Sequence, residues 1–147
     1  MEPRFSVRAT ARQGSPATAY VRARSFEVGL PLTFDPEYGH VTALELVLGA
    51  VAGELVTGLL RLARERRLAV HHVEAVCDGE LDNPLTHLGV VGEEGHPGLV
   101  GLSVKVFVDS DEDEAGLRRA WDETLARSPL VHTFRSVARL DLTLSLG

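Results

Sequence analysis

The chain has 147 residues and a formal net charge of −6, and 44% of its residues are hydrophobic while 24% are charged. This composition is typical of a soluble globular protein, so we expect a single domain over residues 1–147. The acidic balance argues against binding to nucleic acid or to an acidic membrane surface, because both call for clustered basic residues. The first eight residues lack the apolar core of a signal peptide, and a single cysteine excludes an intrachain disulfide, so a cytoplasmic protein is expected.

The N-terminal part of the chain predicts a β-hairpin. Residues 5–11 alternate between apolar and polar side chains, which is typical of a half-buried strand. Gly14-Ser15-Pro16 predicts a turn, and residues 19–30 predict a second strand that completes the hairpin. Residues 34–40 are then expected to form a loop.

A long apolar helix is predicted from Thr42 to about Arg67. Thr42 and Glu45 have the spacing of a capping box, and the following residues are apolar around nearly the whole circumference. The predicted strands are too few to cover such a helix, so we expect a second subunit to complete the core. The apolar part ends at Leu60 and is followed by arginines, so we interpret it as too short and too polar for a membrane span. Small residues would let another helix approach closely at Gly49, Gly53 and Gly58.

Glu54 is the only charged residue between positions 46 and 60. A carboxylate in such surroundings must find a partner or be held in its neutral form. Two interpretations stay open at this point. Glu54 acts as a general acid or base in a dry pocket, or it pairs with an arginine, for example one of the partner chain, and helps to specify the dimer.

The rest of the chain predicts further strands and a second, shorter helix. This helix begins near Ser110 with a run of acidic residues, which the helix dipole favours, and Ser128-Pro129 ends it. Alternation or short apolar runs predict strands over residues 73–77, 88–91, 100–108 and 139–144. The order of elements indicates an α+β fold.

Two motifs on the predicted helices resemble those of the OsmC/Ohr family of osmotically inducible and organic-hydroperoxide-resistance proteins. The central helix of that family begins with Pro-x-Glu-Leu-Leu-x-Ala-x-x-x-Cys, which residues 42–55 follow. Its second motif, Cys-Pro-Val, is matched by Ser128-Pro129-Leu130. The resemblance implies an OsmC-like fold with an N-terminal β-hairpin, a long central buried helix, antiparallel strands, a second short helix and a C-terminal strand. It also implies an intertwined homodimer with sites at the subunit interface.

The same resemblance implies a chemistry that this chain does not carry. In active members, one cysteine attacks the hydroperoxide as a thiolate and becomes a sulfenic acid, and a second cysteine resolves it as a disulfide. Here Glu54 occupies the first position and Ser128 the second. A carboxylate cannot form a sulfenic acid and a hydroxyl cannot resolve one, so Glu54 and Ser128 are candidate catalytic positions without thiol peroxidase chemistry.

Ser128 and two histidines are the remaining candidates near these positions. Ser128 is a hydrogen-bond donor to a ligand, a nucleophile assisted by His132, or simply a serine at a helix end. His40 precedes the long helix and would border the pocket of Glu54 in a dimer, so His40 and His132 are candidate binding residues. The six histidines have no metal-ligand spacing, and neither a metal nor a cofactor is predicted.

Cys77 is the only thiol, and it lies mid-strand among small apolar residues, which favours a packed and unreactive side chain.

The leading interpretation is a homodimer without thiol peroxidase activity that binds a small apolar ligand at its interface, with no nucleic-acid or membrane partner. One alternative is a non-redox enzyme, a hydrolase or an isomerase, that uses Glu54 as a general acid or base. The other is a residual organic hydroperoxide reductase that works through Cys77.

Overall fold

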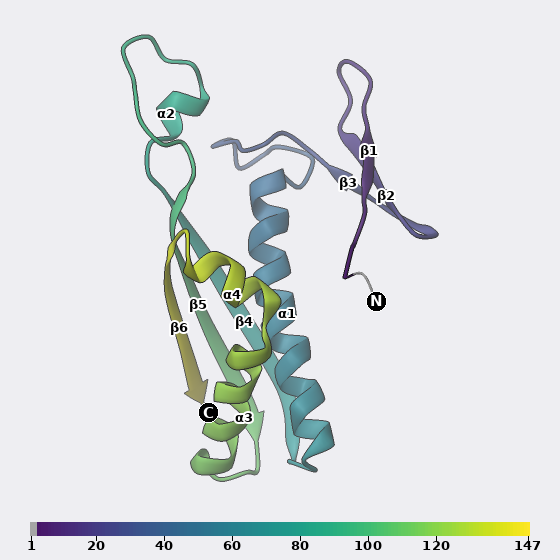
Figure 1. Cartoon of the computed structure of the whole chain (residues 1–147), viewed down its shortest axis with the longest axis vertical. Helices are drawn as coiled ribbons and strands as arrows, with labels where there is room; N and C mark the ends of the chain where they lie inside the picture. The colour runs from purple at the N-terminus through teal and green to yellow at the C-terminus, as the bar shows by residue number, and fades with distance from the viewer. Residues whose placement is uncertain (1–2) are drawn as a thin grey trace. The chain divides into compact units, whose positions relative to one another are not determined.

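The computed structural model describes residues 3–147, and the chain divides into one compact unit that ends at Val47 and a second that runs from Leu48 to Gly147. The elements are those of an α+β protein, with two three-stranded sheets and four helices in the described residues (Figure 1). The fold class predicted from the sequence is confirmed.

The first unit contains a small antiparallel sheet of β1 (Arg8–Thr10), β2 (Ala17–Val21) and β3 (Arg24–Val28), in that order. The predicted hairpin is confirmed, but the single strand predicted over residues 19–30 is wrong. That stretch forms parts of two strands, because the chain reverses between Val21 and Arg24, which pair with each other. Arg22 takes a positive φ of 52° in this turn, and turns of this kind normally contain glycine or asparagine. The sequence therefore carried no turn signal there.

Helix α1 (Ala43–Glu65) begins in the first unit and continues in the second. Its predicted capping box is confirmed, since the Glu45 N–H donates to Thr42 Oγ1 (3.1 Å) and the Thr42 N–H donates to Glu45 Oε1 (3.0 Å). These bonds with Thr42 lower the pKa of the Glu45 carboxyl. The helix ends at Glu65, and Arg67 has a positive φ of 55° just beyond it, so the predicted end was two residues too late.

The second unit is built on a sheet of β4 (Val70–Leu81), β5 (Leu99–Ser110) and β6 (Arg139–Leu146). Strands β4 and β5 are antiparallel, and β6 lies parallel to the other edge of β5. The parallel pair requires a crossover connection, which α3 (Glu114–Arg127) and α4 (Pro129–Arg135) supply.

The connection between β4 and β5 differs from the prediction. Helix α2 (Pro84–His87) lies there, and residues 88–91 form no strand. Asn83 caps α2 by accepting the Leu85 N–H (3.1 Å), and Pro84 takes the first helical position, where its missing N–H costs nothing. These local signals favour a helical turn over the short apolar run that suggested a strand.

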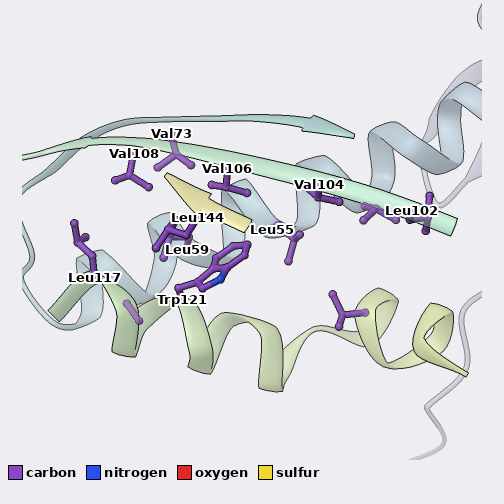
Figure 2. Close-up of a cluster of buried hydrophobic side chains, with 13 residues drawn as sticks. Leu55, Leu59, Val73, Leu102, Val104, Val106, Val108, Leu117, Trp121 and Leu144 are labelled. Atoms are coloured by element: carbon purple, nitrogen blue, oxygen red, sulfur yellow. The ribbon is translucent and has the colours of Figure 1, made fainter. Parts of the chain in front are cut away.

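The core of the second unit lies between the sheet and the helices α1 and α3 (Figure 2). Alternate residues of β5, among them Val104 and Val106, point toward Leu55 and Leu59 of α1 and toward Trp121 of α3. All five side chains are at most 4% exposed. This packing fixes one side of α1 against the sheet and therefore fixes the direction in which Glu54 points.

The opposite side of α1 is not covered by the second unit. Nothing in that unit lies within 4 Å of a Cβ built at Gly49 or Gly53, whereas a Cβ at Gly58 would lie 3.2 Å from Thr124 Cγ2 of α3. By length and composition alone, the 23 residues of α1 are long and apolar enough to cross a membrane. The interpretation of this stretch as too short and too polar for a membrane span is therefore wrong on those two criteria, which the core helix of a soluble protein also meets. The Val51, Leu55 and Leu59 side chains of α1 pack on the sheet instead.

A histidine–aspartate pair at one end of the sheet predicts a pH-dependent contribution to stability. His71 Nε2 lies 2.7 Å from Asp111 Oδ2, and the pKa of His71 is raised, first by this hydrogen bond and the charge of Asp111 and then by Asp109. A raised folded-state pKa means that the stabilisation is fully present below the ordinary value of 6.5 and is lost as the pH rises through the raised value.

We therefore expect His71→Gln to lower the melting temperature more at about pH 5.5 than at about pH 8.5. The effect is small because both side chains are largely exposed. Thermal unfolding followed by circular dichroism measures it, and His87→Gln, at an exposed histidine of α2, is the control. An equal loss at the two pH values contradicts the role given to Asp111.

Candidate functional site

The structure brings Glu54 and Ser128 into direct contact, although 74 residues separate them in sequence. Glu54 lies on the α3 side of α1, and Ser128 lies at the junction of α3 and α4. The Ser128 hydroxyl donates a hydrogen bond to Glu54 Oε1. Two residues that the sequence singled out for separate reasons thus form one polar pair between the helices.

Ser128 holds this position because it caps a helix. It ends α3 and begins α4, and its Oγ accepts the Val131 N–H at 3.0 Å, which is a standard N-cap bond. Pro129 occupies the first position of α4, which suits its fixed φ and missing N–H. The Ser-Pro pair was expected to end one helix, and it also starts another. The side chain is 4% exposed, so the hydroxyl is held almost out of water.

The partners of Glu54 are neutral groups. Besides the hydroxyl of Ser128, its Oε1 accepts the backbone N–H of Leu130 at 3.3 Å. Among residues 3–147 no salt bridge is formed to Glu54. The arginine partner considered from the sequence is therefore not found within the described part of this chain, and two hydrogen bonds from α4 take its place.

A pocket of about 230 Å³ opens beside the pair, between α1 and the end of α3. Its wall combines apolar groups and polar ones, and all of them belong to the second unit: Glu54, Gly58, Arg61, Leu62, Thr124, Arg127, Ser128 and Pro129. Sequence analysis did not identify Arg61 or Arg127 as site residues. A signal was present, because Arg61 lies two helical turns after Glu54 and Arg127 directly precedes Ser128.

The two histidines named as candidate binding residues have other contacts. His132 Nε2 lies 2.8 Å from the carbonyl oxygen of Ala126, and its side chain does not line the pocket. His40 belongs to the first unit, where its Nδ1 lies 3.6 Å from Glu27 Oε2 and its ring packs edge-on against Tyr38. Neither contact places a histidine beside the hydroxyl of Ser128.

Cys77 lies on β4, and its surroundings disfavour a thiolate. Burial raises the pKa of its thiol, and the charge of Asp78 raises it further. Because the thiolate is the reactive form of cysteine, this environment agrees with the packed, unreactive side chain predicted from the sequence. Within residues 3–147, no group of three or more His, Cys, Asp or Glu side chains is placed to hold a metal ion.

Comparison with known proteins finds relatives in structure and not in sequence. No protein-family model and no curated protein matches the chain. Among solved structures, an OsmC-like protein from Mycoplasma pneumoniae has a TM-score of 0.80 at 15% identity and covers 99% of each chain. An organic hydroperoxide resistance protein OsmC from Legionella pneumophila has a TM-score of 0.71 at 12% identity, covering 98% of this chain and 99% of its own.

The organic hydroperoxide resistance protein OhrB of Bacillus subtilis is also similar, with a TM-score of 0.64 at 16% identity over 96% of this chain and 98% of its own. In these three comparisons the similarity covers at least 96% of this chain and of the other chain. At such identities it is a likeness of fold. The chain therefore has the OsmC/Ohr-like fold that the motifs on its two helices predicted. Its single cysteine, Cys77, lies at neither redox position of the resemblance.

Proposed function

We propose that this protein is a cytoplasmic homodimer of OsmC-like fold that has no thiol peroxidase activity and binds a small, largely apolar ligand in the pocket beside Glu54 and Ser128. The contact between Glu54 and Ser128 carries this proposal. The motifs align these residues with the two redox cysteines, and the fold brings the two side chains together as a redox pair would require. Both are oxygen groups, so neither can pass through a sulfenic acid or a disulfide.

The pocket supports a binding role. It is smaller than the roughly 300–1,000 Å³ typical of sites for drug-sized molecules, so its occupant is small. Leu62, Pro129 and the bare backbone of Gly58 supply apolar wall, and a few polar groups converge on it. Such a mixture is typical of ligand sites, where the polar groups fix the orientation of an apolar molecule.

The homodimer is supported by the uncovered side of α1. On that side Gly49, Ala50 and Gly53 are exposed, and most other apolar residues of α1 are only partly buried. Soluble proteins rarely expose a long apolar helix face, and a second copy of the same chain covers it with the symmetry that most oligomers have.

The absence of peroxidase chemistry is tested by turnover of organic hydroperoxides. With cumene hydroperoxide and a dithiol reductant, we expect the wild-type protein to consume peroxide at the rate of a protein-free control, because the thiol of Cys77 is disfavoured as a thiolate. Cys77→Ser should give the same rate. Robust turnover that Cys77→Ser abolishes would establish the residual reductase instead.

Ligand binding is tested by thermal shift with a library of small apolar acids and alcohols. We expect at least one compound to raise the melting temperature, as any ligand selective for the folded state does. Gly58→Ala should weaken that shift, because the added Cβ would lie 3.2 Å from Thr124 Cγ2 and would narrow the pocket. Arg64→Gln, at an exposed residue of α1 outside the pocket, should leave the shift unchanged. If neither this library nor the corresponding small apolar amines and amino acids give a hit, the binding role is contradicted.

One observation favours a second candidate function. A serine hydroxyl that donates to a carboxylate is the arrangement of a nucleophile with its base, so a hydrolase that uses Ser128 and Glu54 is the alternative. The burial of Ser128 and its bond to the Val131 N–H weigh against it. Hydrolysis of p-nitrophenyl acetate that Ser128→Ala abolishes would favour this alternative over the binding role.

A further inference from the structure

The pocket beside Glu54 and Ser128 carries opposite charges on its wall. The wall includes the carboxylate of Glu54 and the guanidinium groups of Arg61 and Arg127. Arg61 follows Glu54 by seven residues, which is about 10 Å along the axis of α1, and both side chains are long enough to reach toward a molecule between them. The pocket therefore exposes one acidic and two basic side chains to the same small molecule.

Each charged group has bonding capacity that the chain leaves open. The Glu54 oxygen Oε1 accepts from Ser128 and Leu130, whereas no residue within 3–147 donates to Oε2. In the described residues, Thr86 Oγ1 is the only buried side-chain nitrogen or oxygen atom without a hydrogen-bond partner. Glu54 Oε2, which accepts no hydrogen bond from these residues, is therefore not buried, and solvent or a ligand reaches it.

The two arginines are similarly incomplete. Arg61 uses its Nε–H to bond Glu65 Oε1 (3.1 Å), and Arg127 Nη2 lies 3.4 Å from Glu123 Oε1. A guanidinium group has five N–H donors and binds a carboxylate best through two of them at once. The remaining donors are available to an anionic group in the pocket without breaking either pair.

A simple acid would meet the arginines but would also face the negative charge of Glu54, and a simple amine would face the reverse conflict. A molecule that carries both charges can pair with Glu54 and with the arginines, and its uncharged body matches Gly58, Leu62 and Pro129. We propose, on the basis of the binding function proposed above, that the ligand is a small zwitterion of the apolar amino-acid class. Its carboxylate lies at Arg61 and Arg127, and its ammonium group lies at Glu54.

Four small molecules with nearly the same carbon skeleton separate the contributions of the two ligand charges to affinity. Leucine carries both charges, 4-methylpentanoate only the negative one, 3-methylbutylamine only the positive one, and 3-methylbutanol neither. Isothermal titration calorimetry on the full-length protein is expected to rank leucine first, with the acid and the amine each about tenfold weaker or more, since each loses a charge-assisted hydrogen bond.

Two variants assign the charges to residues. Arg61→Gln should weaken leucine and 4-methylpentanoate by about tenfold and leave the amine unchanged. Glu54→Gln should weaken leucine and the amine and spare the acid, and it keeps an amide oxygen that accepts from Ser128 and Leu130, so the fold is preserved. Arg64→Gln should change none of the affinities.

The outcomes separate this inference from the function on which it rests. If 3-methylbutanol or 4-methylpentanoate binds as tightly as leucine, the zwitterion is overturned while ligand binding stands. If none of the four probes binds but the compound library gives a hit, the zwitterion is likewise overturned. If neither the probes nor the library binds, the proposed binding function fails as well.

Discussion

Replacing Glu54 with leucine is expected to lower the free energy of unfolding by about 2–5 kcal/mol. The change removes the acceptor of the Ser128 hydroxyl and of the Leu130 N–H. Hydrogen bonds to a charged group contribute about 1.5–3 kcal/mol each, and the stranded donors keep their desolvation cost. Burying the apolar leucine side chain offsets roughly 1 kcal/mol of this loss. Urea unfolding monitored by Trp121 fluorescence measures the difference.

Conservative and double variants separate the hydrogen bonds from the packing. Glu54→Gln retains an acceptor oxygen at the same distance along the side chain, so we expect a loss below about 1 kcal/mol. In Glu54→Leu with Ser128→Ala, no hydroxyl is left stranded, and the double variant should lose about 1–2 kcal/mol less than the sum of the two single changes. If Glu54→Leu alone stabilises the protein, Glu54 is merely tolerated in the helix and its bonds to α4 contribute nothing.

The sequence identified both members of this pair but not the contact between them. Glu54 was conspicuous as a lone charge in an apolar helix, and Ser128 preceded a proline that had to end a helix. Their meeting depends on how β4, β5 and α3 return the chain to α1, a non-local arrangement that no spacing rule contains. Only the resemblance to a family with two cysteines at these positions placed them together in advance.

The errors have equally specific causes. The tight turn at Arg22 lacks glycine and asparagine, so residues 19–30 looked like one strand. The run at 88–91 is apolar, but the capping by Asn83 and the position of Pro84 determine a helical turn before it. Arg61 and Arg127 resemble ordinary charged residues near helix ends, and their place in the site depends on the packing of α1 against α3 that forms the pocket.

If the proposed homodimer forms through α1, substituting glutamate for Gly53 is expected to convert it to a monomer of 15.9 kDa. Gly53 lies on the side of α1 that the second unit leaves uncovered, with nothing of that unit within 4 Å of a built Cβ. If a second copy covers this side, the substitution places two carboxylates in one symmetric interface, because each change occurs twice. Burying unpaired charges costs several kcal/mol, enough to dissociate an ordinary dimer. Size-exclusion chromatography with light scattering gives the mass directly.

The same variant has the opposite effect if α1 is exposed to water. Glycine is among the least favourable residues in a helix, and replacing it with glutamate at a solvated position stabilises a helix by roughly 0.5–1 kcal/mol. Ala115→Glu on the exposed surface of α3 is the matched control, and it should leave both mass and stability nearly unchanged. A wild-type protein that is monomeric at micromolar concentration contradicts the proposed homodimer. So does a Gly53→Glu variant that keeps its mass and becomes more stable.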